Sequence, residues 1–225
     1  MPSSTTSGPL LDSKVLGVLD RLRAENRPPF TGAESAPPAG RRPPHEGVMD
    51  PFDFPDVAFP IHPDQGDLLY LLCRATAATR VVEFATSLGI STIYFAAAVR
   101  DNGGGTVIGS EIVPEKAAAA QRNLAEAGLA ALVDVRVGDA RETLRHLGGP
   151  VDFALIDGFP APAGPTLALQ VMEIIAPQLR TGALVMNDNG EADYLDFVRD
   201  PANGFRSMSL PIKGSTELSV KVAGA

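Results

Sequence analysis

The sequence predicts an α/β fold, in which a mostly parallel sheet of seven strands carries helices on both faces. Helical and strand-like segments alternate from residue 64 to residue 187. The strand-like segments are apolar almost throughout, which is typical of strands covered on both sides. The last two, 206–210 and 217–222, are joined by PIKGST with no helix between them. We therefore expect an antiparallel hairpin at the C-terminal end of this domain.

The first 63 residues differ in composition from the rest, because they hold 12 of the 20 prolines. Apolar residues recur at helical spacing between Asp12 and Asn26, and Asp12 is placed to cap a short amphipathic helix. We interpret 1–63 as an N-terminal helix followed by a proline-rich arm or lid, and 64–225 as the main domain.

Pro-Pro pairs within 27–63 favour extended or irregular backbone. A disordered tail is the alternative for 1–8 and for 32–47. Phe52 and Phe59 belong to a stretch that is too apolar for a solvated tail.

In the main domain, Pro114 and Gly128 are placed to open and close one of the helices. The expected helices are 64–77, 89–100, 114–128, 140–147 and 166–179, and the expected parallel strands are 80–85, 106–112, 132–137, 151–157 and 183–187. In such a sheet, ligands bind at the carboxyl ends of the strands.

Composition excludes several classes of function. Asp and Glu outnumber Lys and Arg by 27 to 19, and a net charge of −8 disfavours nucleic acid and anionic membranes as partners. Cys73 is the single cysteine and most resembles a core residue, so no internal disulfide or cysteine-rich zinc site forms. No apolar run approaches the roughly 18–20 residues of a membrane span. We expect a soluble cytoplasmic protein.

The turn after the first strand, EFATSLGIST, contains one glycine, Gly89. The G-x-G-x-x-G pattern that binds a dinucleotide pyrophosphate is absent, which ranks a nicotinamide oxidoreductase last. A nucleoside without a pyrophosphate remains compatible, and Glu111, 22 positions later, could accept both ribose hydroxyls. The alternative is that Gly89 relieves a tight turn and Glu111 is a surface charge.

Polar residues also follow the later strands. Asp139 could accept a hydrogen bond from an adenine amino group, or cap the next helix, or do both. Asp157, Asp188 and Asn189 end the fourth and fifth strands, and their hard oxygen donors suit Mg²⁺ completed by water and substrate oxygens. The alternative for Asp-Asn-Gly is an ordinary turn.

The order of seven segments along the chain indicates a resemblance to known proteins. The segments are PIHPDQGDLLYLLCRAT, EFATSLGIST, GSEIVPEKAAAAQRNLAEAGL, VGDA, ALIDG, VMNDNGEADYLDFVRDP and LPIKGSTELSVKV. Together they resemble the cation-dependent O-methyltransferases, the class that includes catechol and caffeoyl-coenzyme A O-methyltransferases. The likeness runs from about Pro60 to Val222, roughly three quarters of the chain. It implies a Rossmann-like, doubly wound version of the predicted fold and S-adenosylmethionine (SAM) as cofactor.

The resemblance also implies roles for individual residues. Glu83 and Gly89 would shape the loop at the methionine end of SAM, Ser91 would contact the carboxylate, and the metal set would be the one given above. The full set expected at the cofactor is Glu83, Ala85, Gly89, Ser91, Glu111, Ile112, Gly138, Asp139, Ala140 and Asp157.

Two positions depart from the family pattern. Ala85 stands where the family's loop usually has glycine, and Pro160 stands where the family has a lysine that takes or steadies the hydroxyl proton. Either the acceptor needs no protein base or another group replaces the lysine. His45 and His62, both in the arm, are the candidates, with solvent-facing side chains as the alternative. His146 is interpreted as structural.

The sequence thus predicts a SAM-dependent O-methyltransferase that acts, with a divalent cation, on a small aromatic or vicinally oxygenated acceptor. Two alternatives stay open: a metal-independent N-, C- or carboxyl-methyltransferase, and a SAM-binding protein without turnover. The amphipathic N-terminal helix and the apolar arm favour a homodimer.

Overall fold

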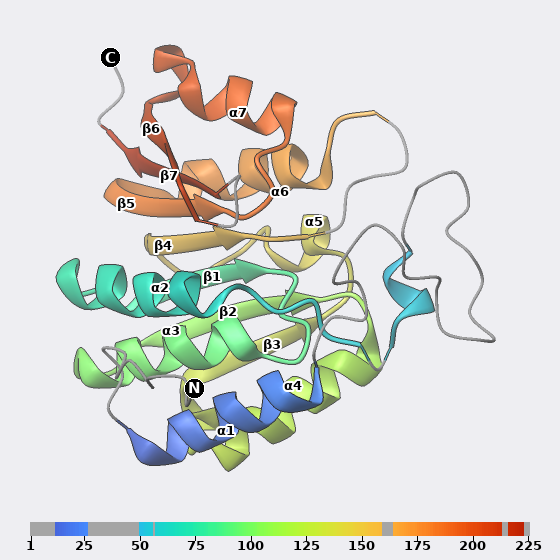
Figure 1. Cartoon of the computed structure of the whole chain (residues 1–225). Helices are drawn as coiled ribbons and strands as arrows, with labels where there is room; N and C mark the ends of the chain where they lie inside the picture. The colour runs from blue at the N-terminus through green and yellow to red at the C-terminus, as the bar shows by residue number, and fades with distance from the viewer. Residues whose placement is uncertain (1–11, 27–49, 56, 159–163, 213–215, 223–225) are drawn as a thin grey trace.

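The computed structural model describes residues 12–26, 50–55, 57–158, 164–212 and 216–222. Within them, one sheet of seven strands has the order β3-β2-β1-β4-β5-β7-β6 (Figure 1). The strands are β1 Arg80–Phe84, β2 Thr106–Glu111, β3 Val133–Val137, β4 Val151–Ile156, β5 Leu179–Asn187, β6 Phe205–Leu210 and β7 Thr216–Lys221. The first five pair in parallel, and β7 runs antiparallel to β5 and β6. The predicted fold class is confirmed.

Helices cover both faces of the sheet. The α-helices are α1 Ser13–Glu25, α2 Pro63–Ala75, α3 Ile90–Asp101, α4 Pro114–Glu126, α5 Ala140–Thr143, α6 Leu167–Ile175 and α7 Ala192–Arg199, and the short 3₁₀ turns are η2 Pro51–Asp53, η3 Ala130–Leu132, η4 Ala176–Gln178 and η5 Pro201–Asn203. One apolar cluster joins α1 to α4 with one face of the sheet, and a second joins α5 to α7 with the other. Among the described residues, no helix is both long and apolar enough to cross a bilayer.

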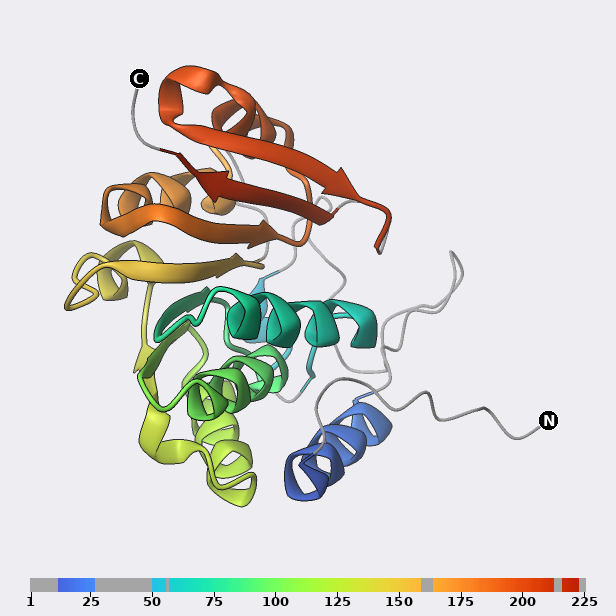
Figure 2. The same ribbon diagram turned by 90° about the vertical axis from the view of Figure 1, so that its left-hand side faces the viewer.

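The N-terminal helix α1 forms as predicted. The Asp12 carboxylate caps it by accepting hydrogen bonds from the Lys14 and Val15 amides. Its apolar side is buried in the first cluster, at the end of the molecule far from the β6–β7 hairpin (Figures 1 and 2). Because this chain's own core already covers that apolar side, α1 no longer supports the homodimer, which stays a prediction.

Three predicted boundaries are wrong. The helix expected over 140–147 ends at Thr143, because side chains from elsewhere bind the carbonyl groups that follow: Arg136 binds those of Thr143 and His146. The helix expected over 166–179 gives way at Ile175 to a 3₁₀ turn that contains Pro177, where a continuing α-helix would clash. The fifth strand therefore starts at Leu179 rather than at residue 183.

The strand order places the functional edge of the sheet. The order reverses between β1 and β4, which lie side by side with β5 next to β4. In open parallel sheets, a crevice forms outside the carboxyl ends of the strands at such a reversal. The loops after these three strands therefore belong to one site.

Candidate active site

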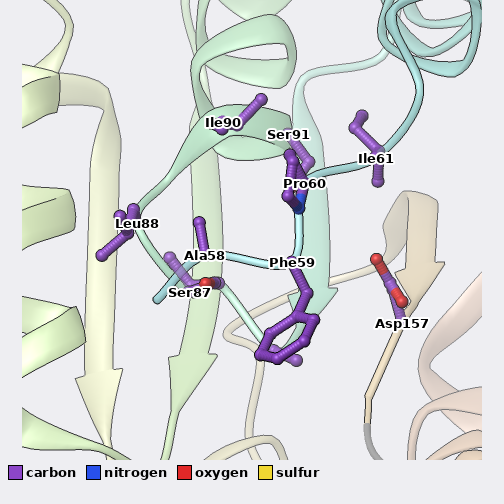
Figure 3. A pocket seen from close by; sticks show the side chains of 11 residues that line it. Ala58, Phe59, Pro60, Ile61, Ser87, Leu88, Ile90, Ser91 and Asp157 are labelled. Carbon is purple, nitrogen blue, oxygen red and sulfur yellow. The ribbon is translucent and has the colours of Figure 1, made fainter. Parts of the chain in front are cut away.

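A pocket of about 260 Å³, partly open to solvent, lies at this edge of the sheet (Figure 3). The loop between β1 and α3 lines one side of it, and residues of the N-terminal arm line another. The lining residues are Ala58, Phe59, Pro60, Ile61, Ala85, Thr86, Ser87, Leu88, Ile90, Ser91 and Asp157. The arm thus lies against the loop that was predicted to bind SAM.

The backbone of this loop is unusual. Ala85, Ser87 and Gly89 have φ angles of 71°, 51° and 87°, in the left-handed region that favours glycine. At Gly89, a Cβ atom would also come within 3.2 Å of the Ala120 side chain. At Ala85, the methyl group in place of the glycine expected from the resemblance costs about 1–2 kcal/mol. The loop keeps this shape because the Ala85 and Thr86 amides both donate to the Ser110 carbonyl at 3.0 Å.

Buried polar atoms without partners gather at the end of β1 and in the loop after it. Glu83 Oε1, Thr86 Oγ1 and Ser87 Oγ are buried, and none has a hydrogen-bond partner among the described residues. Native proteins leave few such atoms, so three within five residues require an explanation. The ammonium and carboxylate groups of a bound amino acid would satisfy them, which fits the methionine end of SAM.

Glu83 is fully buried at the centre of this group, with its Oε2 atom accepting from the Thr92 hydroxyl at 2.5 Å. Burial raises the pKa of Glu83 to about 7, although the nearby hydroxyl groups of Ser91, Thr92 and Thr86 oppose the shift. A positively charged ligand would favour the ionised form, so this carboxyl group is suited to hold an ammonium group.

Glu111 ends β2 and is 5% exposed, so the interpretation of this residue as a surface charge is wrong. Its Oε2 atom accepts from the Ser87 amide at 2.6 Å, and its Oε1 atom accepts from the Val113 amide at 2.9 Å. A carboxylate has about four acceptor positions. Glu111 therefore holds the loop in place and retains capacity for ribose hydroxyls.

Asp139 caps α5, as one of its two interpretations predicted. It accepts from the Arg141 amide at 2.8 Å and from the Arg141 guanidinium, which together hold the pKa of Asp139 below its usual value. Gly138 lies beside Glu111, since its amide donates to the Glu111 carbonyl at 2.9 Å. Ala140 is buried and Ile112 is 38% exposed. The contact between Asp139 and adenine stays a prediction.

The two acids proposed to bind a metal follow neighbouring strands in register. Ile156 pairs with Asn187, so Asp157 and Asp188 are the next residues of β4 and β5, and the Asp188 amide donates to the Ile156 carbonyl at 3.1 Å. Adjacent strands lie about 4.8 Å apart, which sets the separation of the two backbones. The strand pairing therefore brings these two acids together.

The surroundings of this pair combine a buried acid with an exposed amide. Asp188 is 1% exposed, whereas Asn189 is exposed and donates to the Gly158 carbonyl at 3.2 Å. Asn187 stabilises the turn, because its Oδ1 atom accepts from the Gly190 amide. Within the described ranges, no three His, Cys, Asp or Glu side chains form a metal-binding group. Two carboxylates and one amide oxygen nevertheless fit a Mg²⁺ ion that keeps several waters.

Sequence reasoning missed one residue of the site, Gln65. Its Nε2 atom donates to Asp188 Oδ1 and also to Thr216 Oγ1, and its side chain is 1% exposed. A detectable signal existed, because Gln65 occupies the third position of α2, where a glutamine completes a capping box. Its long-range contacts had no such signal.

Comparison with known proteins shows what the chain is similar to. Residues 82–190 match the model of a methyltransferase domain. A catechol O-methyltransferase of Niastella koreensis is 34% identical over 136 residues, 59% of this chain and 58% of that protein. A catechol O-methyltransferase of Mycobacterium tuberculosis is 40% identical over 111 residues, 49% of each chain. The central part of the chain is thus similar to the class I SAM-dependent O-methyltransferases.

Solved structures share the fold of this chain. Cofactor-bound Rv0187 from MTB is 28% identical, with a TM-score of 0.64 over 75% of this chain and 85% of that one. The O-methyltransferase from Bacillus cereus in complex with SAH is 21% identical, and its TM-score of 0.68 over 96% and 93% of the two chains shows the shared fold. The chain spans about half to three fifths of the length of the curated relatives that it matches.

The structure adds little support for the histidines that were proposed as general bases. His62 is the N-cap of α2, and its Nδ1 atom accepts from the Asp64 amide at 3.3 Å. The cap occupies Nδ1, and the role of His62 as a base stays a prediction. His45 and Pro160 lie outside the described residues. His146 is exposed in the turn after α5 and not on a helix.

Proposed function

We propose that this protein transfers the methyl group of SAM to a hydroxyl group of a small, vicinally oxygenated acceptor, with a divalent cation held by Asp157, Asp188 and Asn189. The pairing of β4 with β5 carries the proposal, because it sets two acids side by side next to the SAM loop. Carboxylates on adjacent strands lie close enough to repel each other, and a cation or a proton between them would relieve this repulsion. The curated relatives named as catechol O-methyltransferases support the acceptor class.

The loop after β1 and the end of β2 would hold SAM. Glu83 would bind the ammonium group, while the unpartnered hydroxyls of Thr86 and Ser87 would donate to the carboxylate. Glu111 would accept from the ribose hydroxyls, and Asp139 from the adenine amino group. These contacts would orient the methyl donor toward the edge where Asp157 and Asp188 lie.

The acid pair would position the acceptor. A bound divalent cation lowers the pKa of a coordinated hydroxyl group and aligns it with the methyl group. Asp157 and Asp188 would supply the charge that holds such an ion, and Asn189 would supply a neutral oxygen. Phe59 closes one side of the pocket opposite Asp157 and would exclude water from the acceptor (Figure 3).

The proposal assigns no protein base. The sequence has no Lys, Arg or His between Asp157 and Arg180, and His62 uses Nδ1 to cap α2. The same two observations favour a second candidate function, a SAM-binding protein without turnover. The two candidates differ in one respect, because only the first requires the acceptor hydroxyl group to lose its proton at this site.

The test is Mn²⁺ uptake by the full chain saturated with S-adenosylhomocysteine, measured as loss of the free-ion electron paramagnetic resonance signal. We expect one site in the wild type and none in Asp188→Ala. Asp200→Ala is the matched control, because Asp200 caps the 3₁₀ turn after α7 and is not one of the proposed ligands. Absence of uptake by the wild type would refute the cation mechanism. Uptake without methylation of any catechol in an acceptor panel would favour the second candidate.

A further inference from the structure

Gln65 connects three segments that are distant in sequence. Its Nε2 atom donates one hydrogen bond to Asp188 Oδ1 and another to Thr216 Oγ1, the latter at 2.9 Å. Its Oε1 atom accepts from the His62 amide at 2.8 Å. The side chain thus joins the start of α2, the end of β5 and the start of β7, and it is 1% exposed.

A primary amide suits this place better than the other side chains of its length. It offers two N–H donors and one carbonyl acceptor, and all three are used here. Glutamate would place a second negative charge against Asp188 and would lose both donors. Capping alone uses only the Oε1 atom, so it does not account for the two buried donors aimed at Asp188 and Thr216.

The bond to Oδ1 has a consequence for the rest of the Asp188 carboxylate. Holding one oxygen fixes the rotation of the group about its Cβ–Cγ bond, and so fixes the direction of Oδ2.

We propose that Gln65 is a positioning residue that orients the Asp188 carboxylate for the cation, an inference that rests on the proposed function. Groups that hydrogen-bond to metal ligands set ligand orientation, and their loss lowers metal affinity by about 10–100-fold. The hydrogen bonds of Gln65 join it to His62, Asp188 and Thr216. We therefore expect its effect to fall on cation binding and on the rate that depends on it.

The experiment measures Mn²⁺ affinity of the full chain saturated with S-adenosylhomocysteine, by electron paramagnetic resonance. In Gln65→Met, which keeps length and volume but lacks both donors, we expect a fall of about 10–100-fold. S-adenosylhomocysteine affinity, measured by calorimetry, should stay within about twofold. If that variant fails to fold, Gln65→Asn replaces it, because the shorter side chain stays polar but withdraws the amide from Asp188.

Two control variants distinguish an effect of Gln65 on the orientation of Asp188 from a general effect on the stability of the fold. Gln178→Met removes another glutamine with three hydrogen bonds, to Leu147, Leu144 and Ile174, and should leave Mn²⁺ affinity unchanged. Thr216→Val removes the second acceptor of Gln65 Nε2, together with the hydrogen bond that the Thr216 hydroxyl donates to the Ile212 carbonyl. We expect it to lower thermal stability and to keep Mn²⁺ affinity within about threefold, well short of the loss in Gln65→Met.

Each result decides the inference. Equal Mn²⁺ affinity in the wild type and Gln65→Met would overturn it while leaving the proposed cation site intact. Equal losses of Mn²⁺ affinity in Gln65→Met and Thr216→Val would show that Gln65 only connects the three segments structurally. That result would overturn the inference as well. No uptake by the wild type would refute the cation site itself, and this inference with it.

Discussion

The two ends of the sheet each bury an acid, and the two acids differ in how fully they are hydrogen-bonded. At the amino end, Asp152 of β4 accepts from the Thr79 and Arg80 amides at 2.7 and 2.8 Å and from the Arg180 guanidinium at 2.5 Å. At the carboxyl end, Glu83 of β1 leaves Oε1 without a partner among the described residues. An acid whose oxygens all accept hydrogen bonds joins strands, whereas an acid with an unpartnered oxygen marks a place where a ligand is expected.

The pKa values of Asp152 and Glu83 follow the same difference in hydrogen bonding. Burial alone would raise the pKa of Asp152, but the hydrogen bonds from Arg180, Thr79 and Arg80 hold it below its usual value. Burial raises the pKa of Glu83 to about 7, because its hydroxyl partners compensate less. The two acids thus shift in opposite directions, because Glu83 is buried more deeply than Asp152 and has no oppositely charged partner in the described part of the chain.

The largest expected effect on cofactor affinity tests the carboxyl end of the sheet. Glu111→Gln removes the charge that accepts from two amides and, in the proposal, from the ribose. Hydrogen bonds to charged groups contribute about 1.5–3 kcal/mol, so the affinity for S-adenosylhomocysteine should fall by about 10–100-fold in calorimetry. An unchanged affinity would mean that Glu111 only holds the loop.

The matching change at the amino end should act on stability instead. Asp152→Asn removes the charge from a partly buried ion pair with Arg180, and we expect the free energy of unfolding to fall by about 3 kcal/mol in urea. Affinity for S-adenosylhomocysteine should stay the same. A loss of affinity without a loss of stability would abolish the distinction between the two ends.

Glu83 should make stability depend on pH. Its folded pKa of about 7 lies above the ordinary value of 4.5, so the folded state binds the proton more tightly and loses stability as pH rises between these values. In Glu83→Gln this loss is absent, and the variant should gain up to about 3 kcal/mol on the wild type between pH 4.5 and pH 8. Urea unfolding at several pH values measures the difference, and parallel curves would contradict it.

A smaller effect is expected at the strained loop. Ala85→Gly relieves a φ of 71° and should raise the free energy of unfolding by about 1 kcal/mol. Ala140→Gly, at a helical position, is the control and should lower it by a similar amount. Destabilisation by Ala85→Gly would show that the methyl group makes contacts that outweigh the strain.

The smallest effect is expected at His62. Asparagine is also a good N-cap, so His62→Asn should change stability by less than about 0.5 kcal/mol and methyl transfer by less than about twofold. A general base contributes about 10²–10⁴-fold. A drop in rate of that size, with cofactor affinity unchanged, would make His62 the base after all.

Much of the fold was predictable because it depends on local pattern. Apolar runs gave the strands, and their alternation with helices gave a parallel sheet whose carboxyl ends meet at one edge. That rule brought Glu111, Asp157 and Asp188 to one edge, whereas Glu83 was expected there from the family resemblance. The end of α5 was not predictable, because Arg136 binds carbonyl groups at Thr143 and His146 that the local sequence assigns to a helix.

The rest of the site depends on contacts that local pattern does not record. Gln65 meets Asp188 across 123 positions and Thr216 across 151. The unpartnered hydroxyls of Thr86 and Ser87 are equally invisible in sequence, because their isolation follows from the left-handed backbone of the loop. Chemistry at strand ends is predictable, whereas the side chains that orient it are found only in three dimensions.

The position of β7 between β5 and β6 imposes an order on folding during synthesis. β6 emerges from the ribosome first, but its neighbour in the sheet is β7, so β6 has no place to pair until β7 has also emerged. Thr216, at the start of β7, is the last residue to reach the cluster around Gln65 and Asp188. A nascent chain that stops before this residue contains every proposed ligand of the cation and still lacks the completed site.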